Sequence, residues 1–418
     1  MTSTYNKPFL TIDEQIDRLM KRGLEIDSRQ QASHHLRRIG YYRLSGYWYP
    51  FRQHAPTEGE RRPSEFKSGT SLRTVLDVYE FDEKLRTALM AAISRVEVDF
   101  RFRIGHSLGR HGPFAHCDAD NFDPDWSTPQ PRACSAPSCT AHCAWTSSDH
   151  QTWLERQKAS ESVSKEAFTA HIHDEYGEPL PVWVATEVMS FGVLARLLNG
   201  MKQRDRQQLA ADLDIIDAQG NGDAATLSNW VEHLRQVRNA CAHHARVWNK
   251  NFDAVIAVPQ GMPEVAHLSA TPADLQNATE PSAAVRRIYG TLAILSFLLA
   301  RIDNDLSCRN TIRAEIEQFA TDQPGRLDSM GFPPGWANQD LWQESYARDA
   351  ERARHAELMR SIQMLTTKDA AALLTSKPTE NKRRSRLNYY RKHGALLSVP
   401  WTVSWELMPS GGKPWNGG

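Results

Sequence analysis

The chain lacks three features that would narrow its class at once: a net charge, a long apolar run and a dense set of cysteines. Its 50 Lys and Arg balance 50 Asp and Glu, so any attraction for nucleic acid must come from local patches. The sequence has no apolar run that could span a bilayer and no signal-peptide segment. Its 6 cysteines in 418 residues do not form a secreted disulfide framework. We therefore expect a soluble, cytoplasmic protein with two or three domains.

One short segment, from Leu234 to Asn249, concentrates cationic and titratable side chains and contains no carboxylate. Apolar residues recur at helical spacing from Ala225 to Asn249, with Thr226 or Ser228 as a possible N-cap, so we expect one helix here. Fixed positive charge beside an imidazole suits chemistry on a phosphodiester, and RNA can supply a nucleophile through its 2′-hydroxyl. The polar positions are Arg235, Arg238, Asn239, His243, His244 and Arg246.

Helical geometry separates the two most reactive side chains of this segment. Arg235, Asn239, His243 and Arg246 follow at steps of four, four and three and form one polar stripe. Arg238 lies five residues before His243, so their Cβ directions diverge by about 140°. Three arrangements would bring both groups to one phosphate: the long arginine stem, a local distortion, or a second copy of the helix. The ordinary alternative is a solvated helix face with no catalytic role.

Several ordered motifs carry a resemblance to a known family. R-N-A-C-A-H at 238–243 resembles the Arg-x4-6-His signature of HEPN ribonucleases, and C-A-H-H-A-R-V-W-N at 241–249 is similar to the version in abortive-infection (Abi) proteins of the AbiD/AbiF type. The likeness runs from about Lys7 to Trp342. Its other motifs are T-I-D-E-Q-I-D-R-L-M-K-R-G-L-E-I at 11–26, G-Y-Y-R-L-S-G-Y at 40–47, Y-E-F-D-E-K-L-R at 79–86, P-V-W-V-A-T-E-V-M-S-F-G at 181–192 and M-G-F-P-P-G-W at 330–336.

The apolar patterns predict an all-α protein, and the resemblance implies that its main domain is a HEPN-like helical bundle. We divide the chain into an N-terminal helical, aromatic and basic region (1–68), a helical domain (69–343) and a charged C-terminal extension (344–418) that is partly disordered. Residues 11–53 predict two short helices. In the main domain we expect four or five helices, among them a long one at 72–108 and others at 183–198 and 284–302.

The resemblance implies a metal-independent endoribonuclease without a cofactor, acting in phage defence by abortive infection or as the toxin of a toxin–antitoxin pair. Arg238, Asn239 and His243 would be the catalytic residues, with His244, Arg235 and Arg246 in support, and the products would carry 2′,3′-cyclic phosphate and 5′-hydroxyl ends. We expect a homodimer with a composite site, RNA as substrate, a small regulatory RNA or an antitoxin as further partners, and no membrane. The alternative is a non-catalytic RNA-binding protein that uses the same basic helix.

Two carboxylates and one aromatic segment are further candidates. Glu97 could hold an arginine or orient His243, or it could form an ordinary helix-surface pair with Arg101. Glu187 interrupts an apolar run; if it is buried, Arg238, Arg235 or a backbone N–H is its natural partner. Basic and aromatic residues near the N-terminus suit RNA binding, although Tyr and Trp there could instead pack against the next domain. The RNA-binding candidates are Arg37, Arg38, Tyr41, Tyr42 and Arg43.

Residues 111–150 form an insertion rich in Cys, His, Asp, Pro and Ser. A zinc site there, built from Cys117, Cys134, Cys139 and Cys143, is one interpretation, and it would suit a zinc-dependent DNA-binding regulator; a flexible insertion is the other. Cys241 and Cys308 are expected to be packing residues. In the C-terminal extension, 344–367 is helix-prone, 377–393 is basic enough for RNA contact or for a solvated tail, and 409–418 is expected to be disordered.

Overall fold

The computed structural model of the protein describes residues 8–55, 57, 62–133, 144–269, 282–302 and 306–346. Contacts group residues 1–347 into one compact unit, and the proposed division near residue 68 remains a prediction. Within the described ranges the fold is helical with one small two-stranded sheet, so the all-α class is confirmed. None of the described helices is both long and apolar enough to cross a bilayer.

The α-helices are α1 Ile12–Lys21, α2 Arg29–Ile39, α3 Tyr41–Trp48, α4 Leu72–Gly109, α5 Pro124–Ser127, α6 Asp149–Val163, α7 Ala167–Tyr176, α8 Val182–Val188, α9 Phe191–Gly200, α10 Gln203–Ala211, α11 Ala224–Ala242, α12 Pro263–Ala266, α13 Ala283–Arg286, α14 Ile288–Ile302 and α15 Ser307–Asp322. Short 3-10 helices follow α3 (η1, Tyr49–Phe51) and α4 (η2, Ala115–Cys117), and others close the described chain at Trp336–Asn338 and Asp340–Trp342. The strands β1 Gln130–Ala133 and β2 Ala144–Ser147 pair antiparallel.

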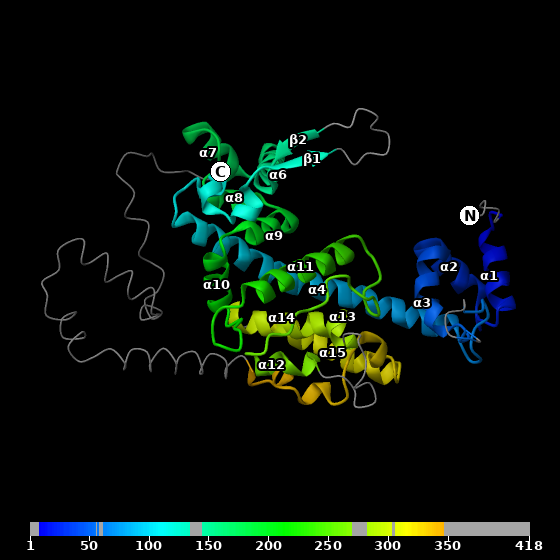
Figure 1. The fold of residues 1–418 in the computed structure, drawn as a ribbon. Helices are drawn as coiled ribbons and strands as arrows, with labels where there is room; N and C mark the ends of the chain where they lie inside the picture. Colours follow the sequence, from blue (N-terminus) through cyan, green and yellow to red (C-terminus); the bar gives the residue numbers. More distant parts are fainter. Residues whose placement is uncertain are drawn as a thin grey trace, which may run out of the picture. The chain divides into compact units, whose positions relative to one another are not determined.

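The long helix α4 is the element around which the unit is built, and its predicted range of 72–108 is confirmed. Ser71 caps it by accepting a hydrogen bond from the N–H of Thr74 at 3.1 Å. The sequence places no proline and no glycine inside it before Gly105, so nothing interrupts the backbone hydrogen bonds. Helices α3, α8, α11, α14 and α15 all pack on α4 (Figure 1). Residues far apart in sequence therefore meet along one rod.

The N-terminal region contains three helices where the sequence predicted two. Gly40, with φ of 92°, ends α2 and lets the chain turn into α3. Tyr47 and Trp48 on α3 are buried. For these two residues the packing interpretation of the aromatic segment is confirmed, because their rings contribute to the core beside α4 rather than to an open surface.

The helix predicted over 183–198 is wrong in one respect: two helices, α8 and α9, occupy this range. Met189 between them is extended, and Ser190 caps α9 by accepting from the N–H of Val193. The guanidinium of Arg101 on α4 donates to the carbonyls of Glu187 and Met189, the latter at 2.9 Å. These two bonds satisfy carbonyls that a helix end leaves without partners, so a tertiary contact stabilises the break.

Several expectations fall on residues outside the described ranges. Cys134, Cys139 and Cys143 belong to this group, as do residues 347–418 with the helix-prone, basic and glycine-rich segments expected there. In the described part of the insertion, Cys117 is exposed and forms no disulfide. Cys241 is buried, as expected for a packing residue, and Cys308 is half-buried.

Candidate active site

The signature helix is α11; its predicted start at Ala225 is confirmed to within one residue, but the predicted N-cap and the predicted end are wrong. Asp223, not Thr226 or Ser228, is the N-cap; its carboxylate accepts from the N–H of Thr226 at 2.9 Å and from its hydroxyl at 2.7 Å. At the other end the helix stops at Ala242, seven residues before the predicted Asn249. An apolar face continues past the true end because Val247 is buried, which explains why periodicity alone extended the helix.

The C-terminus of α11 is closed by a tight turn at the two histidines. His244 has a φ of 55°, a conformation that favours glycine. The N–H of His244 donates to the carbonyl of Cys241 at 3.0 Å, and the N–H of Ala245 donates to the carbonyl of Ala240 at 2.8 Å. This is the hydrogen-bond pattern of a Schellman motif, and it exposes the side chains of His243 and His244 at the helix end.

The geometry of α11 narrows how Arg238 and His243 can reach one phosphate. The N–H of His243 still donates to the Asn239 carbonyl at 2.9 Å, so the backbone follows the helix as far as His243. The divergence of about 140° from Arg238 therefore applies, and a local distortion is not the solution. The flexible arginine stem and a second copy of the helix remain as the two ways to combine these groups.

Arg238 belongs to a small ionic group that we call the Glu97 cluster: Glu97, Arg101 and Arg238. The Glu97 carboxylate receives Arg101 Nη2 at 2.6 Å on one oxygen and lies 3.8 Å from Arg238 Nε on the other. Both interpretations of Glu97 thus have a basis, since it pairs with Arg101 and also faces an arginine of the signature. Among the described residues no second carboxylate lies within ion-pair distance of Arg238, whose side chain is 35% exposed.

The other polar residues of α11 divide between local pairs and open positions. Arg235 binds Glu232 with Nε at 2.7 Å and Nη2 at 2.5 Å from the two carboxylate oxygens. The hydrogen bonds from Arg235 lower the pKa of Glu232. Glu187 is exposed on α8, so the condition for pairing it with Arg235 or Arg238 is not met; its backbone carbonyl accepts a hydrogen bond from Arg101. Asn239 is half-buried on the exposed side of α11.

A buried network that the sequence analysis did not single out fixes the segment after α11. We call it the Asp82 network. One Asp82 oxygen accepts from the N–H groups of Val247 and Trp248 at 3.0 and 2.7 Å. The other accepts from the Tyr47 hydroxyl at 2.6 Å and from the Arg86 guanidinium. Burial raises the pKa of Asp82, while the bond from Tyr47 and the Arg86 charge oppose this shift.

The Asp82 network joins three of the motifs that carried the family resemblance. Tyr47 ends G-Y-Y-R-L-S-G-Y, Asp82 and Arg86 belong to Y-E-F-D-E-K-L-R, and the two N–H groups follow the signature. An aspartate and an arginine four residues apart inside an apolar helix pattern were the signal for a buried pair. Part of what makes these motifs recognisable is therefore structural.

Two arginines predicted to bind or support RNA have structural partners instead. Arg43 Nη1 donates to the backbone carbonyl of His244 at 2.6 Å, and Arg246 donates to the carbonyl of Gly46. Both bonds tie α3 to the turn after α11. The polar stripe predicted for α11 therefore ends at His243, and Arg246 serves to position the chain.

The remaining N-terminal candidates differ in exposure. Arg37, Arg38 and Tyr42 are exposed on α2 and α3. Tyr41 is half-buried, with its ring edge-on to Trp48 and its hydroxyl accepting from Arg22 at 3.1 Å. Among these candidates, Arg43 is the one whose contact with the signature segment is established, through the His244 carbonyl.

His233 shows that not every histidine on α11 is available for chemistry. One ring nitrogen lies 2.6 Å from the Ala254 carbonyl and the other 2.8 Å from the Thr291 hydroxyl. A neutral ring that donates to the carbonyl and accepts from the hydroxyl satisfies both contacts. Burial lowers the pKa of His233 to about 4, so the ring stays neutral at physiological pH.

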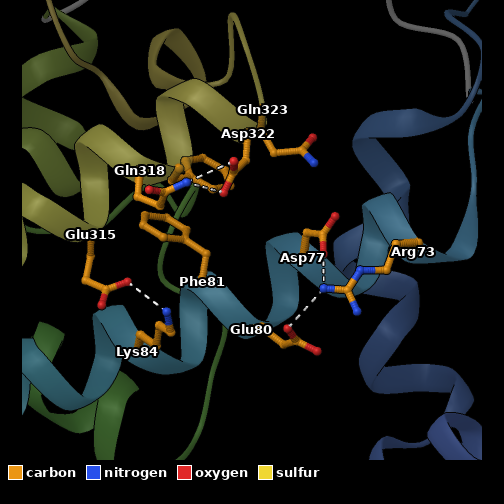
Figure 2. A pocket seen from close by; sticks show the side chains of 10 residues that line it. Arg73, Asp77, Glu80, Phe81, Lys84, Glu315, Gln318, Asp322 and Gln323 are labelled. Carbon is orange, nitrogen blue, oxygen red and sulfur yellow. Dashed lines mark hydrogen bonds and ion pairs between the residues drawn. The ribbon is translucent and has the colours of Figure 1, made fainter.

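A hollow of about 450 Å³ lies between α4 and α15, and its lining charges do not suit phosphate binding (Figure 2). We call it the α4–α15 hollow. Its two cations are already paired: Arg73 with Asp77 and Glu80, and Lys84 with Glu315. The acidic side chains outnumber them, so the hollow repels a polyanion. In the described ranges, no group of three or more His, Cys, Asp or Glu side chains is arranged to hold a metal ion.

The region that resembles a known protein family contains the site residues described above. No curated protein matches the chain, and no solved structure matches it either. The sequence model of the family described as Abi-like protein matches residues 34–249. This range includes the Asp82 network, the Glu97 cluster and the whole of α11, and it covers more than half of the chain. The chain therefore belongs to the Abi-like protein family, which indicates a role in abortive infection.

Proposed function

We propose that the protein is an endoribonuclease of the HEPN type that cleaves RNA without a metal ion, in phage defence by abortive infection or as the toxin of a toxin–antitoxin pair. The observation that carries the proposal is the placement of the signature residues. Arg238 on α11 and His243 at its C-cap are accessible, while Arg43, Arg246 and His233 are engaged elsewhere.

In the proposed reaction the RNA 2′-oxygen attacks the adjacent phosphorus and the bond to the 5′-oxygen breaks. His243 takes the proton from the 2′-hydroxyl or delivers one to the leaving 5′-oxygen, a role for which its exposed ring suits it. The guanidinium of Arg238 offers two N–H groups to the phosphorane oxygens, and Asn239 positions the phosphate or the histidine. The products carry a 2′,3′-cyclic phosphate and a 5′-hydroxyl.

Glu97 is the positioning residue in this scheme. It lies beside Nε of Arg238, at 3.8 Å, and can hold the stem of the arginine while the two terminal nitrogens turn to the phosphate. Arg101 shares the same carboxylate, so Glu97 is fixed from two sides. A carboxylate held in this way keeps its partner's orientation without competing for the whole guanidinium.

A homodimer completes the proposed site. Because Arg238 and His243 diverge on a single helix, Arg238 of one protomer and His243 of its partner would meet more easily across a two-fold axis than within one chain. An acid and a base are both needed, and two copies supply two imidazoles. A free nuclease of this kind would damage host RNA, so restraint by an antitoxin or a small regulatory RNA belongs to the proposal.

The test is cleavage by the purified full chain in EDTA, with the product ends identified by chemical and enzymatic end analysis. We expect cyclic-phosphate ends from the unaltered protein. His243→Ala and Arg238→Ala should each reduce the rate about 10²- to 10⁴-fold, and His243→Ala should leave RNA binding largely intact. His171→Ala, at an exposed histidine on α7, is the matched control. RNA binding without cleavage under every activating condition would instead favour a non-catalytic RNA-binding protein.

A further inference from the structure

The face of α4 next to the Glu97 cluster carries apolar side chains that no described element covers. Val98 and Phe102 are 60% and 64% exposed, and His106 follows one turn later. The rings of Phe102 and His106 stack with centroids 5.5 Å apart and planes 17° from parallel. Trp183 on α8 is 50% exposed beside them. Large aromatic surface in contact with water is costly and indicates a binding surface.

Between α4 and α8 this face is hollowed into a groove of about 320 Å³, which we call the α4–α8 groove. Two glycines allow α8 to lie against α4. A Cβ at Gly105 would stand 2.8 Å from the Thr186 hydroxyl and 3.1 Å from Trp183 Cα, and one at Gly109 would stand 3.2 Å from the Trp183 ring. The close contact holds the Trp183 ring in place at the groove wall. The groove is thus a built feature of the α4–α8 packing.

The charged side chains of the groove are arranged along its length. Arg101 and Glu187 line the end that adjoins the Glu97 cluster, and Arg110 lines the end beyond Trp183. Arg110 is exposed and can hold a phosphate. Glu187 would repel a phosphate, but its carboxylate can accept from the amino group on the edge of a base. This arrangement fits a nucleotide whose base and phosphate lie at different ends.

We propose that the α4–α8 groove binds one unpaired nucleotide of single-stranded RNA, beside the linkage that is cleaved. The base extends the stack of Phe102 and His106 and contacts Trp183, Glu187 accepts from its edge, and Arg110 holds a phosphate. The inference rests on the proposed function and names the substrate class of the same site. Aromatic faces with neighbouring cations serve single strands, whose bases are free to stack.

The α4–α8 groove differs from the α4–α15 hollow in the properties that matter for this ligand. Both lie along α4, but the hollow is lined by acidic side chains with paired cations, and its Phe81 ring is stacked on Phe319 at 3.8 Å. In the groove, the Phe102 ring has one stacked neighbour and keeps a face open. Of these two hollows, the groove is the one that offers a free aromatic face next to a guanidinium.

The test measures binding of a labelled 2′-O-methyl oligonucleotide, which cannot be cleaved through its 2′-oxygen, by fluorescence anisotropy with the full chain. Phe102→Ala and Trp183→Ala should each weaken binding about 5- to 150-fold, the range found for one stacked base. Tyr176→Ala, at an exposed aromatic residue on α7, should not. Arg110→Gln should lower the salt dependence of log Kd by about 0.7, as expected for one phosphate contact on a single strand.

The outcomes separate this inference from the proposed function. If Phe102→Ala and Trp183→Ala bind like the unaltered chain while His243→Ala stops cleavage, the groove assignment is wrong and the nuclease stands. If both variants lose binding but no condition yields cleavage, the groove stands and the nuclease is wrong. Analytical sedimentation of the same variants measures their oligomeric state and provides a third test. Conversion of a dimer to a monomer by Phe102→Ala would overturn the inference, because the face would then be an interface between copies of the chain.

Discussion

Two carboxylates on the same helix, Asp82 and Glu97, have opposite surroundings. Asp82 is fully buried, and its two oxygens are occupied by two N–H groups, a hydroxyl and a guanidinium. Glu97 is 8% exposed and faces two arginines, one of which reaches solvent. Around Asp82 every donor is already used, so none remains for a ligand. Around Glu97 one arginine reaches solvent and can still donate to a ligand. Both carboxylates are buried, so what separates the structural one from the positioning one is whether an arginine partner reaches solvent.

The largest effect that this comparison predicts is on Asp82. Asp82→Ala should lower the free energy of unfolding by about 3–5 kcal/mol, because Arg86 would remain buried without its counter-charge. Urea unfolding followed by circular dichroism measures it. Glu83→Ala, at the exposed neighbouring position, should change stability by less than about 0.5 kcal/mol. Equal losses from the two variants would show that Asp82 is not a special position.

On the signature helix, His233 is also buried with both of its polar atoms occupied by partners. This predicts that the free energy of unfolding depends on pH. The pKa of His233 is lowered to about 4 in the folded chain, against about 6.5 when unfolded. The stability that the neutral His233 ring contributes is therefore fully present above pH 6.5. As pH falls toward 4 this stability is lost, by up to about 3 kcal/mol. The free energy of unfolding should fall more steeply between pH 7 and 5 in the unaltered chain than in His233→Gln. His171→Gln is the control, and an unchanged slope in His233→Gln would contradict the assignment.

Glu97 should behave differently from Asp82 in both stability and activity. Glu97→Gln should cost about 1–2 kcal/mol, between the values for exposed and buried ion pairs. RNA cleavage should fall because Arg238 loses its positioning partner. Glu97→Asp keeps the charge and should restore part of the rate. A stability loss as large as that of Asp82→Ala, with cleavage unchanged, would reverse the proposed division of roles.

The smallest predicted effect is at the end of α11. His244 has a left-handed backbone, so His244→Gly should raise the free energy of unfolding by about 0.5–1 kcal/mol. Cleavage should persist if His244 only shapes the turn and provides a carbonyl for Arg43. Thermal unfolding and the cleavage assay measure the two effects. A gain in stability with complete loss of cleavage would instead make His244 the second acid.

Local sequence predicted the elements that depend on uninterrupted periodicity. Helix α4 ends within one residue of its predicted end, because an apolar pattern without proline specifies such a helix locally. The existence of α11 and the burial of Cys241 were also predicted. Their side chains face the core at helical spacing, and this is visible in sequence without knowledge of the partners.

Element ends and side-chain partners depended on residues far away in the chain. Arg101 stabilises the break between α8 and α9, and Arg43 holds the turn at His244. Glu187 stood in an apolar run and was a candidate for a buried pair, yet its side chain is exposed beside the α4–α8 groove. Periodicity records which face of a helix is apolar but not which helix covers it, so these features lay beyond sequence reasoning.

For this protein, the sequence by itself determined that the chain is helical and that Arg238, Asn239 and His243 lie on one signature segment. The tertiary structure decided which of the surrounding charged groups are free. In the folded chain Asp82, Arg43 and Arg246 form hydrogen bonds with backbone groups. Arg238 instead lies beside Glu97 and is partly exposed to solvent. The physical reason is that a buried polar group must find partners wherever the fold brings them, and the order of residues does not state where that is.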